Sequence, residues 1–254
     1  MKNLVYGLMF LVGLTVSSCN NDDDGYSLDD YVITAATYHQ LDGAYYLVND
    51  NGETLWPAAS DFMYSSFEDG DRVTVNYTVL GEDPDGYYDY YVSVNGMELM
   101  LTKDMVIFDE TTTQEQRDTI GSDPIEINNA WIAGDYLTLV FEMPLSYTTH
   151  LVNVVDDLAL DKTDTGATIL ELTHNDFDAP STGYFGWGIA SFNISDLKNQ
   201  AEGENSMVIA LRATDEYGAK VDYATTLLYE FDGEGEVDST LKNFKTQGTK
   251  IDLK

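Results

Sequence analysis

The protein has 254 residues, of which 43% are hydrophobic and 12% aromatic, so the chain can bury a substantial core. Its 45 Asp and Glu residues outnumber 12 Lys and Arg residues, which gives a formal charge of −33. This charge excludes a basic surface for nucleic acid and argues against electrostatic docking on anionic lipid, while the single cysteine excludes a disulfide framework.

The N-terminus has the pattern of an export signal. Lys2 supplies a positive charge, and the apolar stretch over residues 4–16 is shorter than the roughly 20 residues that span a bilayer. Val16, Ser17 and Ser18 then lead into Cys19. This resembles a lipobox, in which signal peptidase II cuts before a diacylated cysteine. We expect a lipoprotein signal peptide over residues 1–18 and acyl chains such as palmitate on Cys19. A secretory signal followed by a structural thiol is the alternative.

An acidic run follows the cysteine. Residues 19–25 contain Asn-Asn-Asp-Asp-Asp and form a predicted tether. The run resembles the surface-export signal of Bacteroidetes lipoproteins, although any charged segment also makes a solvated tether. We expect anchoring at the outer membrane with the globular part exposed at the cell surface.

The first part of the body has the alternation of short strands. Residues 26–118 are predicted to form an OB-like small β-barrel, although strand counting alone does not select the OB topology. Polar turns separate the predicted strands at residues 31–38, 44–48, 54–56, 72–80, 87–94 and 97–108. Asn51-Gly52 and Asn95-Gly96 are expected to be turns, and residues 113–119 are the only candidate for a helical turn.

The second part predicts a different all-β unit. A polar linker is expected over residues 111–123, followed by an antiparallel β-sandwich over residues 124–232. Its predicted strands cover residues 130–132, 136–141, 150–155, 168–174, 187–194, 207–213 and 225–231. Residues 233–254 contain four Lys and four acidic residues and are predicted to be a flexible C-terminal tail.

Tyrosines make the strongest candidate binding surface. In the predicted strand, alternation places Tyr88 and Tyr90 on one face and Tyr87 and Tyr91 on the other, so one pair points outward. Exposed tyrosines stack on sugars or anchor a protein partner, whereas buried ones fill a small core. Trp187 in a Gly-rich segment is a further surface candidate. Two other tryptophans, at positions 56 and 131, are expected in the core.

Candidates for catalysis and metal binding are weak. His39, His150 and His174 are isolated, and the chain has no G-x-S-x-G or P-loop motif, so we expect no catalytic residue, no enzyme activity and no cofactor. Two acidic loops, one with Asp83, Asp85 and Asp89 and one with Asn175, Asp176 and Asp178, lack the spacing of a calcium site and are better explained as solvated turns. No metal site is expected.

Two short motifs resemble the Asp-Ser/Thr-apolar acceptor used for O-glycosylation in Bacteroidetes. They place candidate acceptors at Thr119 in the predicted linker and at Ser239 in the predicted tail. The motif is short, so chance matches are frequent.

The order of landmarks resembles one family. After Cys19 come Gly-Tyr-Ser-Leu-Asp-Asp at 25–30, Leu-Trp-Pro-Ala-Ala at 55–59, Asp-Gly-Asp-Arg-Val at 69–73, Val-Asn-Tyr-Thr at 75–78 and Ile-Gly-Ser-Asp-Pro-Ile at 120–125. The chain is similar to the NigD-like lipoproteins of Bacteroidetes, most strongly up to Trp131. The resemblance implies an N-terminal OB-like barrel, a C-terminal β-sandwich and an association with bacteriocin immunity. It implies no established catalytic or binding residue.

These observations predict a non-enzymatic lipoprotein that binds or protects. A protein partner, including a secreted toxin, is the first hypothesis, and glycan binding as an accessory of nutrient uptake is the second. A carboxylate-pair enzyme is the third. Membrane association would come from the N-terminal lipid, and the acidic charge disfavours nucleic acid as a partner.

Overall fold

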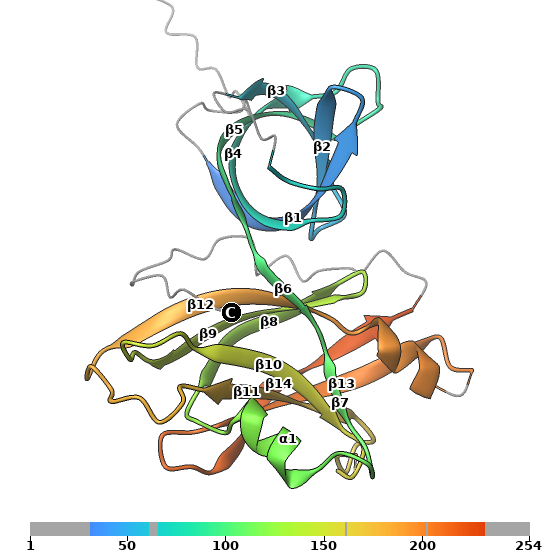
Figure 1. Ribbon diagram of the computed structural model, residues 1–254. Helices are drawn as coiled ribbons and strands as arrows, with labels where there is room; N and C mark the ends of the chain where they lie inside the picture. The colour runs from blue at the N-terminus through green and yellow to red at the C-terminus, as the bar shows by residue number, and fades with distance from the viewer. Residues whose placement is uncertain (1–30, 61–65, 161, 202, 232–254) are drawn as a thin grey trace, which may run out of the picture.

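The computed structural model describes residues 31–60, 66–160, 162–201 and 203–231. The predicted signal peptide, Cys19, the acidic tether and the whole predicted tail with Ser239 lie outside these residues. Within the described part, no helix is long and apolar enough to cross a membrane. The fold is almost entirely β, with a small barrel on top of a two-layered sandwich (Figure 1).

Five strands close the N-terminal barrel. They are β1 (Val32–Leu41), β2 (Ala44–Asn49), β3 (Thr54–Ser60), β4 (Arg72–Glu82) and β5 (Tyr90–Leu99). Their order is β1-β2-β3-β5-β4 with β1 pairing back to β4, and β3 runs parallel to β5. Alternating side chains such as Leu47, Val73, Val75 and Val92 point inward and are fully buried. The predicted OB-like barrel is confirmed.

The predicted turn at Asn95-Gly96 is wrong. Both residues lie inside β5, where Asn76 pairs with Gly96 while Tyr77 pairs with Val94, so Asn95 is the extra residue of a β-bulge. The Asn95 amide bonds side-chain oxygens of β4, and the strand continues instead of reversing. The Asn51-Gly52 turn does connect β2 to β3, with Gly52 at a positive φ of 81°.

The sandwich consists of two sheets. One has the order β6-β12-β9-β8 and the other β14-β13-β11-β10-β7. Their strands are β6 (Leu101–Asp104), β7 (Val106–Phe108), β8 (Glu126–Ala133), β9 (Tyr136–Pro144), β10 (Leu151–Asp157), β11 (Thr168–Asn175), β12 (Phe185–Asn193), β13 (Ser206–Thr214) and β14 (Lys220–Glu230). Four neighbouring pairs are antiparallel, and β6–β12, β7–β10 and β11–β13 are parallel. The predicted β-sandwich is confirmed.

The boundary between the domains lies earlier than residue 118. Strands β6 and β7 descend from the barrel and join opposite sheets of the sandwich, so residues 101–108 belong to the second unit (Figure 1). The polar segment predicted as a linker instead contains α1 (Gln114–Ile120). Thr113 and Gln116 form a reciprocal capping box at the N-terminus of this helix. Its exposed faces explain the resemblance to a linker.

Barrel and sandwich meet through a buried junction. Ala35 of β1, Met100 and Ile189 of β12 pack with Trp131 of β8, whose predicted burial is confirmed at 6% exposure. Beside them, Arg72 at the start of β4 forms two hydrogen bonds of 2.6 and 2.7 Å with Asp50. Trp131 Nε1 donates to the same carboxylate at 2.6 Å. Asp50 and Arg72 both belong to the barrel, and Trp131 of the sandwich connects to their ion pair through this hydrogen bond.

Candidate functional site

The loop between β4 and β5 is organised by one carboxylate. Asp83 accepts hydrogen bonds from the backbone N–H groups of Asp85, Tyr87 and Tyr88 at 2.9–3.0 Å and from the Tyr91 hydroxyl at 2.7 Å. The bond from Tyr91 is the main cause that lowers the pKa of Asp83, and in return it raises the pKa of Tyr91 to about 12. A single Asp side chain therefore fixes residues 83–89, which we name the Asp83 loop.

The other end of the Asp83 loop is fastened to β3. Asp89 accepts from the backbone N–H and hydroxyl of Thr54 at 2.7 and 2.6 Å, and these bonds lower the pKa of Asp89. Asp89 N–H donates in return to the Thr54 hydroxyl at 2.9 Å. The loop that follows β4 is thereby held over the outer surface of β3.

This arrangement corrects the predicted strand over residues 87–94. Strand β5 begins at Tyr90, so the alternation argument does not apply to Tyr87 and Tyr88. Tyr90 packs against the barrel core, and the Tyr91 hydroxyl holds Asp83. Tyr87 is 81% exposed, and Tyr88 is half-buried on the barrel wall. The four tyrosines thus divide into two that support the loop and two on its surface.

Tyr88 belongs to a row of aromatic rings on the outer wall. Its ring lies 4.9 Å from that of Trp56 on β3 and 5.8 Å from that of Tyr46 on β2, measured between centroids. Tyr46 in turn stacks on His39 of β1 at 4.8 Å with an interplanar angle of 17°. We call His39, Tyr46, Tyr88 and Trp56 the aromatic strip. All four are half-buried, so the prediction of Trp56 as a core residue is wrong.

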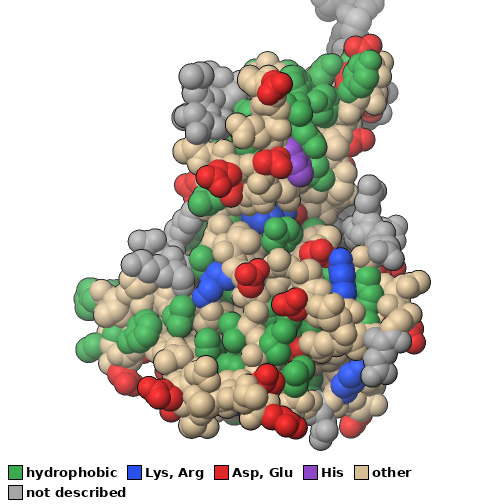
Figure 2. All heavy atoms as spheres, turned by 45° about the vertical axis from the view of Figure 1, so that its right-hand side comes forward, with side chains coloured by type: hydrophobic (Ala, Val, Ile, Leu, Met, Phe, Trp, Pro, Cys, Tyr) green, Lys and Arg blue, Asp and Glu red, His purple; other side chains and the backbone are tan. Residues whose placement is uncertain are grey.

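The strip crosses β1, β2 and β3 and ends beneath the Asp83 loop. Hydrophobic side chains gather on this wall of the barrel, with a histidine and acidic side chains beside them (Figure 2). Asp69 lies 3.5 Å from His39. The β2–β3 face and the β4–β5 loop are the parts of an OB barrel that most often contact ligands. The barrel wall thus presents flat aromatic rings next to acidic side chains.

Trp187 does not lie near the aromatic strip. It lies in β12 rather than in a loop, and it packs against the junction cluster that includes Ala35 and Trp131. Its indole Nε1 is buried and has no hydrogen-bond partner among the described residues. The prediction of Trp187 as a surface residue is wrong because the barrel covers this face of the sandwich.

Two histidines that the sequence left apart are brought together. His150 Nδ1 and His174 Nε2 are 2.7 Å apart, and both residues are 1% exposed. His174 Nδ1 donates to the Pro124 carbonyl at 3.1 Å, so its Nε2 accepts from His150 Nδ1–H when both rings are neutral. His150 Nε2 then accepts from the Ser146 N–H at 3.3 Å. Burial is the main cause that lowers the pKa of His150, and it lowers the pKa of His174 to about 4.

The two acidic loops use their polar groups internally. Asp83 and Asp89 hold the Asp83 loop, as described. In the second loop, Asn175 accepts from the Phe177 N–H and donates to the Thr119 carbonyl, and Asp123 accepts from the Asp176 N–H. Among the described residues, no group of three His, Cys, Asp or Glu residues is placed to hold a metal ion. Thr119 itself lies in the last turn of α1, exposed, with its hydroxyl donating to the Gln116 carbonyl.

The sequence did not predict that His39 and Tyr46 belong to a candidate site or that Asp83 organises its loop. A signal for Asp83 was present in the sequence, because an Asp in a turn commonly accepts a hydrogen bond from a backbone N–H that follows it. The meeting of His39 with Tyr46 depends on the β1–β2 register, in which these residues are paired directly. That register is visible only in the folded barrel.

Profiles of two protein domains match the chain. Residues 37–99 match the NigD-like N-terminal OB domain, and residues 107–225 match the NigD-like C-terminal beta sandwich domain. The chain belongs to the NigD-like family. Both matched ranges agree with the structural boundary near residue 100.

Solved structures agree with the family. A toxin-related protein of Parabacteroides distasonis is 30% identical, with 80% of this chain and 95% of that chain covered and a TM-score of 0.63. A protein of unknown function from Bacteroides vulgatus is 25% identical, with 82% and 93% covered and a TM-score of 0.64. A NigD-like immunity protein of Bacteroides caccae shares the fold at 20% identity, with 82% and 100% covered and a TM-score of 0.58. No curated protein matches the chain.

Proposed function

We propose that this NigD-like protein is a non-enzymatic lipoprotein that captures a protein partner on the aromatic strip and the Asp83 loop. The observation that carries the proposal is the row His39–Tyr46–Tyr88–Trp56, which ends beside the 81% exposed Tyr87. Half-buried aromatic rings in a fixed arrangement are typical of the residues that dominate protein interfaces.

Charge narrows the class of partner. A formal charge of −33 repels polyanions and attracts basic proteins from a distance. A secreted basic protein toxin fits this surface, and one structural relative carries the description of an immunity protein while another is described as toxin-related. Protection by sequestering such a toxin at the outer membrane is the role we assign.

Anchoring would come from the N-terminal segment. A lipid on Cys19 would hold the protein at the outer membrane, and the acidic tether would present the barrel outward. The test is a Cys19→Ser variant, which we expect to leave the membrane fraction and appear in the soluble fraction. Membrane retention equal to that of the native chain contradicts the anchor. Protease accessibility in intact cells tests surface display separately.

The binding test compares tyrosines of the proposed surface with an exposed tyrosine elsewhere. A Tyr87→Ala/Tyr88→Ala variant is expected to lose a partner that the native chain retains when it is purified from intact cells. Tyr147→Ala is the control, because Tyr147 is 89% exposed on the sandwich. Equal retention of the partner by both variants contradicts the proposed surface.

Glycan binding is the second candidate. The exposed ring of Tyr87 and the Trp56–Tyr88 pair offer faces on which a sugar ring can stack. The same two variants, applied to immobilised oligosaccharides, separate the candidates: retention of a glycan that is lost with Tyr87→Ala/Tyr88→Ala favours nutrient uptake, and retention of a protein favours protection.

A further inference from the structure

We propose that Ser146 is a nucleophilic serine that is acylated by an uncharged carboxylic ester, with His150 as its base. Ser146 lies in the loop over residues 145–150, which joins β9 to β10, and it is half-buried. Its Oγ lies 3.1 Å from His150 Nε2, which is within hydrogen-bond distance. The site is separate from the aromatic strip, and the inference does not depend on the proposed function.

A chain of hydrogen bonds orients His150 toward the serine. His174 Nδ1 donates to the Pro124 carbonyl at 3.1 Å, so His174 Nε2 accepts from His150 Nδ1–H at 2.7 Å. His150 Nε2 is then left as an acceptor that faces Ser146 Oγ. A hydroxyl beside a base that a third group orients is the arrangement that activates serine on several unrelated folds. His174 stands where a carboxylate is more usual, and it acts as a positioning residue.

The protonation state of His150 suits a base. His150 is 1% exposed, and burial lowers its pKa below the ordinary 6.5, so the ring is neutral at pH 7. The charges of Asp123 and Asp176 oppose this effect and raise the pKa. His174 is the other titratable group in contact with the ring. The two carboxylates would therefore stabilise the imidazolium that forms while the serine reacts.

Thr148 fixes the position of the serine hydroxyl. Its Oγ1 lies 3.0 Å from Ser146 Oγ and donates to the Asp176 carbonyl at 3.2 Å, and its N–H donates to Ser146 Oγ at 3.3 Å. The Ser146 hydroxyl thus lies between two acceptors, Thr148 Oγ1 and His150 Nε2. The N–H of Tyr147, directly after the serine, donates to no described group, so it can donate to an oxyanion.

Charge restricts the class of ester. The two loops over residues 145–150 and 176–184 contain no Lys or Arg, whereas Asp176 and Asp178 lie in the second loop. Asp123 is close as well, because its carboxylate accepts from the Asp176 N–H at 2.8 Å. These carboxylates repel an anionic ester and leave an uncharged one as the expected acyl donor.

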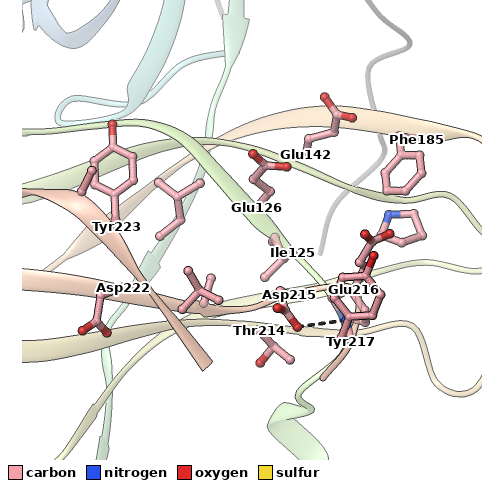
Figure 3. A pocket seen from close by; sticks show the side chains of 16 residues that line it. Ile125, Glu126, Glu142, Phe185, Thr214, Asp215, Glu216, Tyr217, Asp222 and Tyr223 are labelled. Atoms are coloured by element: carbon pink, nitrogen blue, oxygen red, sulfur yellow. Dashed lines mark hydrogen bonds between the residues drawn. The ribbon is translucent and has the colours of Figure 1, made fainter. Parts of the chain in front are cut away.

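Apolar surface for the acyl group lies beside the loop. Pro144 lines a cavity of about 630 Å³, and Ser146 follows it by only two residues, which is at most about 7 Å of chain. Phe185 and Tyr217 lie together at one end of this cavity (Figure 3). The neighbourhood of Ser146 therefore favours an ester with an apolar acyl group.

The proposed step is one acyl transfer. Ser146 Oγ forms a bond to the ester carbonyl carbon, and the bond from that carbon to the alcohol oxygen breaks. The hydroxyl proton passes through His150 Nε2 to the departing alcohol, so no further reactant is needed. The product is an ester on Ser146. The inference thus adds a modification site and does not require turnover.

The test uses the full-length protein in non-ionic detergent with p-nitrophenyl acetate as the probe. Acetylation of Ser146 is followed by peptide mass spectrometry. We expect its rate constant to stay within about twofold between pH 7 and about 8.5, because the base is already neutral there. A serine without a base reacts through its small alkoxide fraction, so a rate that rises about tenfold per pH unit would overturn the proposal.

Matched positions and variants separate activation from exposure. Ser181 is an exposed serine of the other loop and is expected to remain unmodified while Ser146 reacts. His150→Asn keeps a donor for His174 Nε2 but removes the base, so we expect acetylation of Ser146 to slow at least about hundredfold. His39→Gln removes a histidine of the barrel and should leave the rate unchanged. Equal modification of both serines, or an unchanged rate in His150→Asn, would contradict the site. The pH profile of the native chain gives its answer even where His150→Asn fails to fold.

Discussion

The molecule contains two buried polar pairs, one of which is charged and the other neutral. At the junction, Arg72 and Asp50 are 2% and 6% exposed and meet as a charged, bidentate pair, with Trp131 as a third partner. At one end of the sandwich, His150 and His174 meet as neutral rings, because burial lowers both pKa values and an added proton would face a donor, either His150 Nδ1–H or the Ser146 N–H. Both pairs are buried to a similar extent, so the depth of burial alone does not determine the protonation state. The hydrogen-bonding groups around each pair also determine it.

The junction is expected to show the largest effect of any single substitution. Asp50→Ala leaves the Arg72 guanidinium buried without its anion and removes the acceptor of Trp131 Nε1. We expect a loss of about 3–5 kcal/mol in the free energy of unfolding, measured with urea. The compensating double variant Arg72→Met/Asp50→Leu is expected to recover most of the loss, because it removes both charges. A loss below about 1 kcal/mol in Asp50→Ala would show that water reaches the pair.

Gly121 supports the histidine pair from the adjoining segment. Its φ is +83°, and a Cβ there would lie 2.4 Å from Asn175 Cβ and 2.5 Å from the His174 carbonyl oxygen. Gly121→Ala is expected to cost about 2–4 kcal/mol, by combining left-handed strain with overlap against β11. Gly43→Ala is the control, since Gly43 has a φ of +75° but nothing within 4 Å, and about 1 kcal/mol is expected. Equal losses by thermal or urea unfolding would contradict the close approach.

Acid should destabilise the protein through the histidine pair. The pKa of His174 falls from 6.5 to about 4 on folding, so below pH 6.5 the unfolded chain binds a proton that the folded chain excludes. The contribution of His174 to stability is therefore complete above about pH 6.5 and declines as the pH falls toward 4, by about 3 kcal/mol. His150, whose pKa burial also lowers, acts in the same direction. Asp176, whose pKa is raised by burial and by Asp123, opposes this decline at the acidic end of the window.

The pH dependence is measured as urea unfolding at several pH values. His174→Asn keeps a donor for the Pro124 carbonyl but cannot titrate, so its stability curve should be flatter between pH 6.5 and 4. An unchanged slope in His174→Asn would mean that another group carries the dependence.

The sequence predicted the strands and the two-domain architecture better than it predicted the contacts between the domains. The β pattern over residues 136–141 was sufficient to predict the strand that forms most of β9, in which Leu137, Leu139 and Phe141 are fully buried. Thr138 on the opposite face is also fully buried, because the barrel covers it, and no period-2 pattern reveals a covering domain. The covering barrel also explains why the prediction of Trp187 at the surface was wrong.

Contacts between distant strands depend on register, which alternation does not specify. His150 and His174 meet because β10 and β11 pair with Val152 opposite His174. The aromatic strip likewise draws one residue from each of three strands and one from a loop. Of its members only Tyr88 was predicted as a binding residue, and its meeting with His39, Tyr46 and Trp56 was not predicted.

The smallest expected effect concerns Asp83, a carboxylate held by hydrogen bonds alone. Tyr91→Phe removes the hydroxyl bond of 2.7 Å but leaves three backbone donors on Asp83. We expect the pKa of Asp83 to rise toward its ordinary value and the amides of Tyr87 and Tyr88 to exchange on the order of fivefold faster with solvent. Asp83→Asn should have a larger effect on the same amides, because the charge itself strengthens those bonds. If Tyr91→Phe leaves both the pKa of Asp83 and the amide exchange unchanged, the bonds from the three backbone N–H groups to Asp83 are sufficient to hold the loop. The Tyr91 hydroxyl of β5 would then not contribute to the conformation of the surface around Tyr87.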